Sequence, residues 1–536
     1  MFTKSTLIVL LGFLLSFVSF ADEIEQGRQI YDKGILPNGE PLIGVGANDY
    51  NVVGKDAACA NCHRYSGMGG VEGKTLMPPI SANFLFASTK HPFAVTDPSH
   101  PMGITTKDHT YTDSTLANVI STGTNDKGRE LTMVMPRYKL DKEAMSSLVA
   151  YLHQLSLTQS TGVVPGELHF ATVFTPEVDE QTKQIVKTEI ETFVIQHNDT
   201  MSNAQSHRSF GFDRLRINNY EWKFHFWELK GDPDTWESQL EDFNKQQAVF
   251  ALVSGVSYQA ADPVHEFCET HETPCLLRSE LYASNNAGRY NLYFSKGLGL
   301  DANLFSTALK KSVIKKPSNV IQIFTPDSVG ETVSKELSLK LKDQNIPDET
   351  IEFSEDDLSD ISERFAKLGP DEIVFCWCEQ ADLDKLGTIH IPEQAKVYLS
   401  GSLLIMKSGA KELKDPWKNA RVIYPFEIPS TRIKQLKSFY NWIVGHKFEA
   451  SKEVIQSDVY FSMLILQEAV AQMVENLYKD YLVERVENIF GMDLQFWGSY
   501  ARPGLSPAQR FANRSGYITK FDGQMFVPDS DRIIEE

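Results

Sequence analysis

The stretch Cys59-Ala60-Asn61-Cys62-His63 decides how the N-terminal part of this 536-residue chain is organised. Two cysteines separated by two residues on a helical turn match the spacing of the two haem vinyl groups. The histidine that follows then lies under the iron and becomes an axial ligand. The sequence therefore predicts one covalently attached haem c, with thioether bonds from Cys59 and Cys62 and with His63 on the iron. A cysteine pair that binds zinc or forms a disulfide is the alternative.

A haem that only transfers electrons needs a second axial ligand, and a methionine sulfur stabilises ferrous iron. Met135 stands before Pro136 on a restricted loop, just ahead of a predicted helix that begins near Asp141. We therefore predict Met135 as the second ligand. Met133 on the same loop is an alternative ligand. A third possibility is that each methionine only fills space in the apolar core.

Two further features fit a small helical haem pocket. Residues 23–33 form a predicted helix whose Gly27 allows close approach of a second helix, the one that carries Leu148, Tyr151 and Leu152. The prolines after the haem motif favour an extended segment that holds a carbonyl near the His63 ring. Because residues 26–155 contain all four predicted haem contacts, we expect this unit to be complete by itself.

Residues 26–155 resemble a class I c-type cytochrome domain, which implies an all-α fold and haem c with His63 and Met135 as axial ligands. Two connections, residues 34–56 and 83–110, are longer than is usual in that family, and the second leaves His91, His100 and His109 as alternative ligands. The resemblance is carried by Gly27-Arg28-Gln29-Ile30-Tyr31, the haem motif, Pro78-Pro79-Ile80 and Met135-Pro136.

The first 21 residues have the pattern of a signal peptide. A single Lys4 precedes an apolar run over residues 7–18, and Ser19-Phe20-Ala21 places small residues where a signal peptidase cleaves. No cysteine follows to take a lipid, and the run is short for a permanent membrane span. We predict an exported, soluble periplasmic protein that begins near Asp22 and has no membrane span after cleavage.

Charge separates the two parts of the chain and argues against nucleic acid as a partner. The net charge is −19, whereas a phosphate backbone requires a basic surface. Residues 22–159 carry 15 acidic and 12 basic side chains, so nearly all of the negative charge lies in the later sequence.

The later sequence alternates apolar β-rich runs with amphipathic helices. Strands are predicted at residues 169–174, 249–255, 320–325 and 373–378, for example, and helices such as 180–196 and 331–342 lie between them. Such alternation is typical of parallel α/β sheets covered on both faces. A break near residues 281–300 predicts two lobes.

This region, roughly residues 166–526, resembles a type I periplasmic binding protein of the branched-chain amino-acid and amide class. The resemblance rests on the order of elements, on Ser254-Gly255-Val256-Ser257 and Tyr290-Asn291-Leu292-Tyr293-Phe294, and on two later stretches, residues 457–474 and 505–511. It implies two lobes that close on a small solute. The predicted organisation is a signal peptide (1–21), a cytochrome c domain (22–158), a linker (159–166) and a two-lobed binding-protein-like domain (167–536).

In such sheets a ligand lies beyond the carboxyl ends of the strands. The alternative is that polar residues at these strand ends do not touch a ligand but cap helices or form turns. The candidate cleft residues are Ser257, Tyr258, Ser279, Asp327 and Ser402.

The remaining cysteines divide into two pairs. Cys268 and Cys275 flank a helix end that leads into a strand, where a disulfide forms easily in an oxidising compartment, and we predict one. Cys376 and Cys378 face the same way on an apolar strand, so a strained bridge and two buried thiols remain alternatives.

The predicted function is one-electron transfer with a periplasmic redox protein or dehydrogenase, and no enzymatic activity. The binding-protein-like domain would dock that partner or sense a small-molecule solute. The alternative is a periplasmic solute receptor with a redox-sensing haem domain. A haem enzyme needs an open iron position, which Met135 disfavours.

Overall fold

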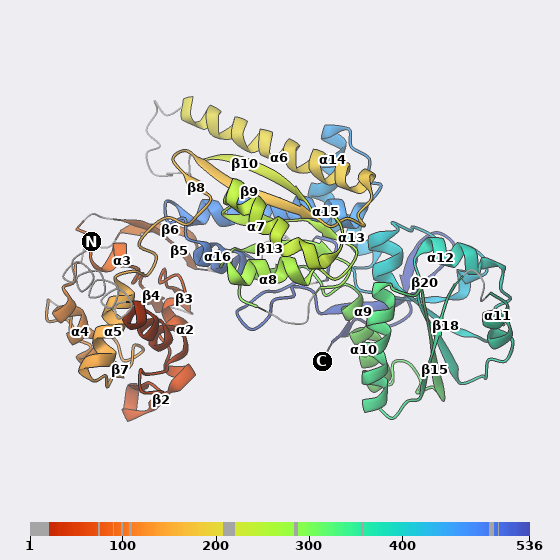
Figure 1. Cartoon of the computed structure of the whole chain (residues 1–536), viewed down its shortest axis with the longest axis horizontal. Helices are drawn as coiled ribbons and strands as arrows, with labels where there is room; N and C mark the ends of the chain where they lie inside the picture. The colour runs from red at the N-terminus through yellow and green to blue at the C-terminus, as the bar shows by residue number, and fades with distance from the viewer. Residues whose placement is uncertain are drawn as a thin grey trace, which may run out of the picture. The chain divides into compact units, whose positions relative to one another are not determined.

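The computed structural model describes residues 21–72, 75–88, 91–97, 100–106, 110–125, 127–206, 220–283, 288–354, 358–491, 498–501 and 503–535. The predicted signal peptide lies outside these ranges except for its last residue. The chain forms two units (Figure 1): Met1–Ser160 with Val470–Arg485, and Thr161–Ala469 with Val486–Glu536. Within the described ranges, no helix is long and apolar enough to cross a membrane.

The first unit, which we call the haem unit, is built around short helices. Its apolar core contains Ile30, Tyr31, Leu116, Leu148 and Leu152, all nearly inaccessible to solvent. The helices are residues 21–33, α2 (Ala60–His63), α3 (Ala82–Leu85), α4 (Asp113–Thr122) and α5 (Lys142–Leu152).

The predicted close packing at Gly27 is confirmed. A Cβ atom at this position would lie 2.0 Å from the Ser147 carbonyl oxygen and 2.7 Å from the Tyr151 Cβ atom. The same approach brings the rings of Tyr31 and Tyr151 to a centroid distance of 5.3 Å. The first helix and α5 therefore touch through their backbones.

The prediction that this unit is all-α needs correction, because the long connections form β structure. Antiparallel strands in the order β2-β1-β7 join residues 34–56 to the segment after Met135. β-Branched Ile43, Val45 and Val53 favour extended chain there. The strands are β1 (Ile43–Val45), β2 (Asn51–Val53), β3 (Gly70–Glu72), β4 (Thr75–Met77), β5 (Pro92–Asp97), β6 (His100–Thr106) and β7 (Arg137–Tyr138).

The second unit, the α/β unit, has the predicted two lobes with largely parallel sheets. The sheet of the first lobe runs in the order β10-β9-β11-β13-β12, and α6 packs along β10 (Figure 1). Its elements are β8 (Val163–Val164), β9 (Glu167–Phe174), α6 (Glu180–Ser206), β10 (Glu221–Glu228), α7 (Trp236–Gln246), β11 (Ala251–Val253), β12 (Val256–Ser257), α8 (Asp262–Thr270), β13 (Cys275–Glu280) and β14 (Asn291–Tyr293).

The sheet of the second lobe runs in the order β16-β15-β17-β18-β19-β20-β21, and its last strands are antiparallel. Its strands are β15 (Asn319–Phe324), β16 (Asp348–Glu352), β17 (Glu372–Trp377), β18 (Lys396–Ser400), β19 (Arg421–Tyr424), β20 (Ser515–Phe521), β21 (Phe526–Pro528) and β22 (Ile533–Ile534). The helices from residue 298 onward are α9 (Leu298–Lys310), α10 (Val329–Asp343), α11 (Leu358–Ala366), α12 (Gln380–Lys385), η6 (Ser402–Lys407), α13 (Pro429–Gln435), α14 (Lys437–His446), α15 (Glu453–Met473) and α16 (Lys479–Gly491).

The predicted disulfide between Cys268 and Cys275 is present and joins α8 to β13 across a Cα–Cα distance of 6.1 Å. Cys376 and Cys378 are buried thiols at the end of β17. The alternative of two buried thiols therefore describes this pair.

The domain boundaries differ from the predicted ones in one respect. The predicted linker, residues 159–166, is close to the observed change of unit after Ser160. The sequence analysis assigned Val470–Arg485 to the binding-protein-like domain, whereas the structure places this segment in the haem unit.

Replacement of Gly27 by Ala should destabilise the haem unit. The added methyl group meets backbone that cannot move without separating two helices, so we expect the free energy of unfolding to fall by about 2 kcal/mol. Calorimetric unfolding of the full chain measures the change. The control is Gly445→Ala in α14, where no atom lies within 4 Å of the new methyl group. An equal loss in both variants would contradict the packing argument.

Candidate haem site and solute cleft

The haem motif forms a single helical turn. Cys59 is the N-cap of α2, and its carbonyl oxygen accepts hydrogen bonds from the N–H groups of Cys62 at 3.2 Å and His63 at 2.9 Å. The Asn61 side chain donates to the Lys55 carbonyl oxygen at 2.8 Å and anchors the turn to the preceding segment. Both thiols and the imidazole thus belong to one short, fixed piece of backbone.

The imidazole of His63 is oriented by the segment that the sequence analysis singled out. Its Nδ1 lies 3.1 Å from the Pro78 carbonyl oxygen, which confirms the predicted contact. A carbonyl can only accept, so Nδ1 carries the proton and Nε2 is the nitrogen suited to bind a metal. A hydrogen bond of this kind fixes the ring and increases its basicity as a ligand.

Glycines make the turn after His63 possible. Gly67 and Gly69 have φ values of 69° and 65°, in the left-handed region. A Cβ atom at Gly69 would lie 2.1 Å from the Met77 carbonyl oxygen. The chain can therefore fold back so that the Gly69 N–H bonds the His63 carbonyl oxygen at 3.0 Å.

The loop that carries the predicted second ligand is also held in place. Met135 is half-buried and packs, together with Cys59, against the apolar core of the haem unit, whereas Met133 is 41% exposed. The Arg137 guanidinium donates to the carbonyl oxygens of Met135 and, at 2.7 Å, of Leu131. These positions favour Met135 over Met133 as the ligand.

Of the alternative histidine ligands, His91 packs beside Phe84, with a ring-centroid distance of 5.7 Å. The side chain of His100 and all of His109 lie outside the described residues.

The residues present fit a haem c. Two thiols and an imidazole occupy one turn, and the thioether of Met135 packs against the same apolar core as Cys59. This donor set matches the one that holds haem in cytochromes c. Among the described residues, no three His, Cys, Asp or Glu side chains are placed so that they could hold a metal ion between them.

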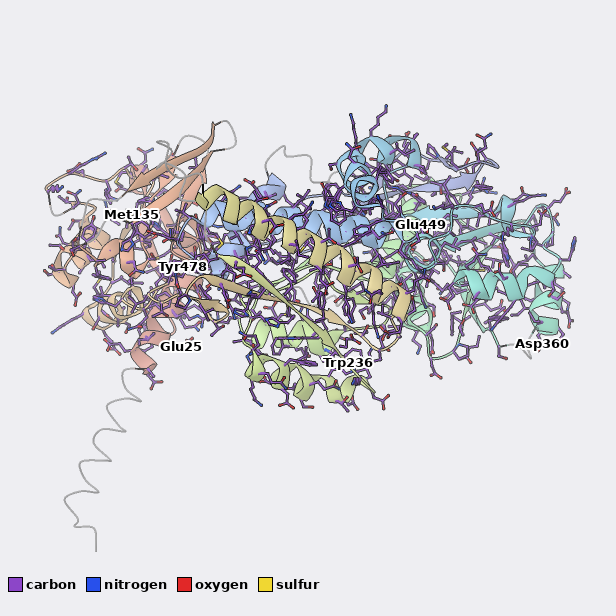
Figure 2. All side chains as sticks on the ribbon, turned by 90° about the horizontal axis from the view of Figure 1, so that it is seen from above. Glu25, Met135, Trp236, Asp360, Glu449 and Tyr478 are labelled. Carbon is purple, nitrogen blue, oxygen red and sulfur yellow. A yellow bond between two sulfur atoms is a disulfide. The ribbon has the colours of Figure 1, made fainter. Side chains whose placement is uncertain are left out.

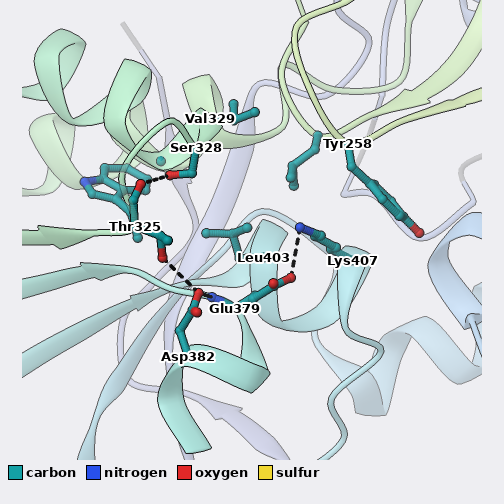
Figure 3. A pocket seen from close by; sticks show the side chains of 11 residues that line it. Tyr258, Thr325, Ser328, Val329, Glu379, Asp382, Leu403 and Lys407 are labelled. Carbon is teal, nitrogen blue, oxygen red and sulfur yellow. Dashed lines mark hydrogen bonds and ion pairs between the residues drawn. The ribbon is translucent and has the colours of Figure 1, made fainter. Parts of the chain in front are cut away.

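The α/β unit has a cavity of about 120 Å³ where its two lobes meet (Figure 3). The first lobe contributes Tyr258 and Leu281, and the second lobe supplies the other walls. These walls are Thr325, Ser328, Val329, Gly330, Trp377, Glu379, Asp382, Leu403 and Lys407.

Two acidic side chains and one lysine determine the electrostatics of this cavity. Lys407 Nζ lies 2.9 Å from a Glu379 carboxylate oxygen and 5.6 Å from the centre of the Tyr258 ring. Asp382 accepts hydrogen bonds from the Thr325 hydroxyl and the Glu379 N–H, both at 3.2 Å. Burial raises the pKa of Asp382, and the Glu379 charge raises it further, against the lowering effect of these hydrogen bonds.

Among the predicted cleft residues, Tyr258 lines the cavity. Ser257 donates to the Gln259 carbonyl oxygen at 2.7 Å, and Ser279 to the Asp458 carboxylate at 3.0 Å. Ser402 binds Asp301 through both its N–H and its hydroxyl at 3.0 Å. Asp327 is an exposed turn residue whose N–H donates to Glu331. These four residues make the structural contacts that polar residues after strands commonly make.

The sequence analysis missed Thr325, Glu379, Asp382 and Lys407. Thr325 directly follows β15 and Glu379 stands two residues after the end of β17, so the rule about strand ends would have found both. Asp382 and Lys407 lie further on, in α12 and at the end of η6, where only the fold brings them to the cavity.

Fold and sites together define a two-part protein, one unit whose side chains fit a haem c and a second, two-lobed α/β unit with a cavity where its lobes meet. Residues 52–156 match the family model for cytochrome c, which implies haem c. No curated protein matches the chain.

Solved structures resemble the α/β part. A solute-binding protein of an ABC transporter from R. palustris, in complex with benzoate, has 11% identity and a TM-score of 0.50, and covers 69% of this chain and 98% of its own. A branched-chain amino acid ABC transporter protein from Thermus thermophilus with bound valine has 11% identity and a TM-score of 0.49, with coverages of 69% and 97%. The first of these likenesses establishes the fold of the α/β unit.

Replacement of Met135 by His should lower the reduction potential, because imidazole donates more strongly to ferric iron than a thioether does. Met133→Leu is the matched control on the same loop and should leave the potential nearly unchanged. Redox titration followed by absorption spectroscopy measures both. An unaltered spectrum and potential in the Met135 variant would place the ligand elsewhere.

Proposed function

We propose that this chain is an exported one-electron carrier that holds a single haem c, covalently, in its haem unit. The main support for this proposal is the 3.1 Å hydrogen bond between His63 Nδ1 and the Pro78 carbonyl oxygen. His63 lies on the same helical turn as the two thiols of the haem motif. When bound, a haem c supplies one-electron oxidation and reduction of its iron.

Each residue of the haem unit has a definite role in this proposal. Cys59 and Cys62 would attach the group, and His63 would bind its iron through Nε2 while the Pro78 carbonyl holds the imidazole ring. Met135 would provide the second iron ligand. Arg137 fixes the backbone of the methionine loop. If His63 and Met135 both bound the iron, no position would remain for a substrate, which favours an electron carrier over a haem enzyme.

The proposed location is the periplasm, on the basis of the N-terminal 21 residues. The proposed partner is a periplasmic redox protein or dehydrogenase that exchanges electrons with the haem unit. The α/β unit would dock that partner or respond to a solute.

The cavity supports a second candidate function, solute binding, with the haem unit as a redox sensor. Its walls combine Trp377 and Leu403 with the hydroxyls of Thr325 and Ser328 and the carboxyls of Glu379 and Asp382. The structural neighbour from R. palustris holds benzoate, an anion. Among the described residues that line the cavity here, Lys407 is the one cation, and it is paired with Glu379. We therefore propose a small neutral or amine-bearing solute that donates hydrogen bonds to these carboxyls.

Replacement of Cys59 and Cys62 by Ala should abolish haem retention in a denaturing gel, because thioether bonds survive unfolding and axial bonds do not. Mass measurement of the wild-type chain should show one added haem on a polypeptide that begins near Asp22. Haem that stays with the denatured double variant would refute covalent attachment through these residues.

Asp382→Asn should weaken binding of the solute by about tenfold or more, since a hydrogen bond to a charged group is worth about 1.5–3 kcal/mol. Calorimetry of the full chain against amino acids, amides and small alcohols identifies the solute and measures the loss. The control is Asp327→Asn, which removes a carboxyl from an exposed turn of the same lobe. Equal affinities in the two variants would exclude Asp382 from the binding site.

A further inference from the structure

A segment more than 300 residues beyond the cytochrome c match completes the haem unit. The Ser160 hydroxyl accepts from the Lys479 N–H at 2.9 Å, and the Asn83 side chain donates to the Tyr478 hydroxyl at 3.1 Å. Tyr478, labelled in Figure 2, thus belongs to the unit of Met135. The segment Val470–Arg485 consists of the end of α15, a short connection and the first half of α16.

Glu484 makes a buried polar contact between this segment and the residues that follow the haem motif. Its side chain is 3% exposed, and its two carboxylate oxygens accept from the N–H of Ser66 at 2.9 Å and from the hydroxyl of Ser66 at 2.5 Å. The two residues are 418 positions apart in sequence. A carboxylate with two donors on one residue fixes both the position and the direction of that residue.

Ser66, which Glu484 holds in place, also makes hydrogen bonds to the backbone next to the haem motif and to the Ser156 side chain. Its hydroxyl accepts from the Met68 N–H at 3.0 Å, and its carbonyl accepts from the Ser156 hydroxyl at 2.8 Å. Gly69, one residue further on, bonds the His63 carbonyl oxygen at 3.0 Å. Ser66 is three residues after His63, a distance of at most about 10 Å along the chain.

We propose that Glu484 is a positioning residue for the haem-binding segment and that its buried charge sets the reduction potential of the haem bound by His63. The inference rests on the proposed haem attachment, but it adds a contribution to the site from a distant part of the sequence.

The charge on Glu484 is adjustable near neutral pH. Burial raises the pKa of this carboxyl to about 7, while the positive charge of Arg64 and the hydrogen bonds from Ser66 lower it and the charge of Asp480 raises it. Tyr31 and Tyr481 are the other titratable groups that interact with it, and burial raises the pKa of both hydroxyls, so they stay neutral here.

The direction of the effect follows from charge. Oxidised haem carries one more positive charge than reduced haem, so a nearby carboxylate stabilises the oxidised form and lowers the potential. Well above the pKa of Glu484 the carboxylate is ionised and the potential is lowered in full. Well below it the carboxyl is protonated and the potential is no longer lowered. The potential of the wild-type protein should therefore fall as pH rises through about 7.

The test uses the full chain with haem attached and compares the wild type with Glu484→Gln by redox titration across this pH range. The variant should have a higher potential above pH 7, nearly the wild-type potential below it, and no step between. Glu143→Gln is the matched control, because it removes an exposed carboxyl on α5 and should leave the curve unchanged. A wild-type chain that acquires no haem would refute the proposed function, a result distinct from failure of this inference.

Ser66→Ala provides a second test should Glu484→Gln fail to fold. This variant keeps the carboxyl but removes one donor that lowers its pKa, so the pH step should move to higher pH. A purely structural role would not shift that midpoint. Identical pH curves for the wild type and Ser66→Ala, or a pH step that persists in Glu484→Gln, would overturn the proposal.

Discussion

The haem unit depends on a constraint that begins at His63, where the chain must reverse direction inside a buried site without leaving polar groups unpaired. An unpaired buried donor or acceptor costs about 1–3 kcal/mol. The reversal succeeds because Gly67 and Gly69 accept positive φ angles and because the Ile80 N–H bonds the Gly67 carbonyl oxygen at 2.7 Å. The same reversal brings the Pro78 carbonyl to His63. The orientation of the His63 ring is thus a consequence of how the backbone satisfies its own hydrogen bonds.

The α/β unit solves a similar problem with a buried carboxyl. Asp301 in α9 accepts hydrogen bonds from the Ser400 hydroxyl at 2.6 Å and from the N–H and hydroxyl of Ser402 at 3.0 Å. Burial raises its pKa to about 7, against the effect of these bonds. Ser402 begins the helix η6 that ends at Lys407 in the cavity wall. A residue expected to touch the solute therefore supports a residue that lines the cavity.

A structural feature could be predicted from the sequence when the residues that produce it lie close together in the chain or when a single residue produces it. The haem motif, the helix contact at Gly27 and the Pro78 carbonyl all depend on short spacings or on one missing side chain, and sequence patterns record both. The β structure of residues 34–56 was missed because its strands are only three residues long, too short for an alternating pattern to stand out, and because β7, the other neighbour of β1, lies about 90 residues later. Asp382 was missed because its place in the cavity depends on the packing of a helix. Glu484 left no signal at all, since a single Glu on an amphipathic helix is ordinary.

The contact between Ser66 and Glu484 also shows that the haem unit is built from two separate stretches of the chain. The chain changes unit after Ser160, after Ala469 and after Arg485, so the two units are joined by three covalent connections rather than by one linker. A fragment that ends at Ser160 has every predicted haem contact but lacks the acceptor for two buried donors of Ser66. The stability of the haem-binding turn is therefore linked to the folding of α16, part of which lies in the α/β unit. No cut of the chain at a single position separates the two units.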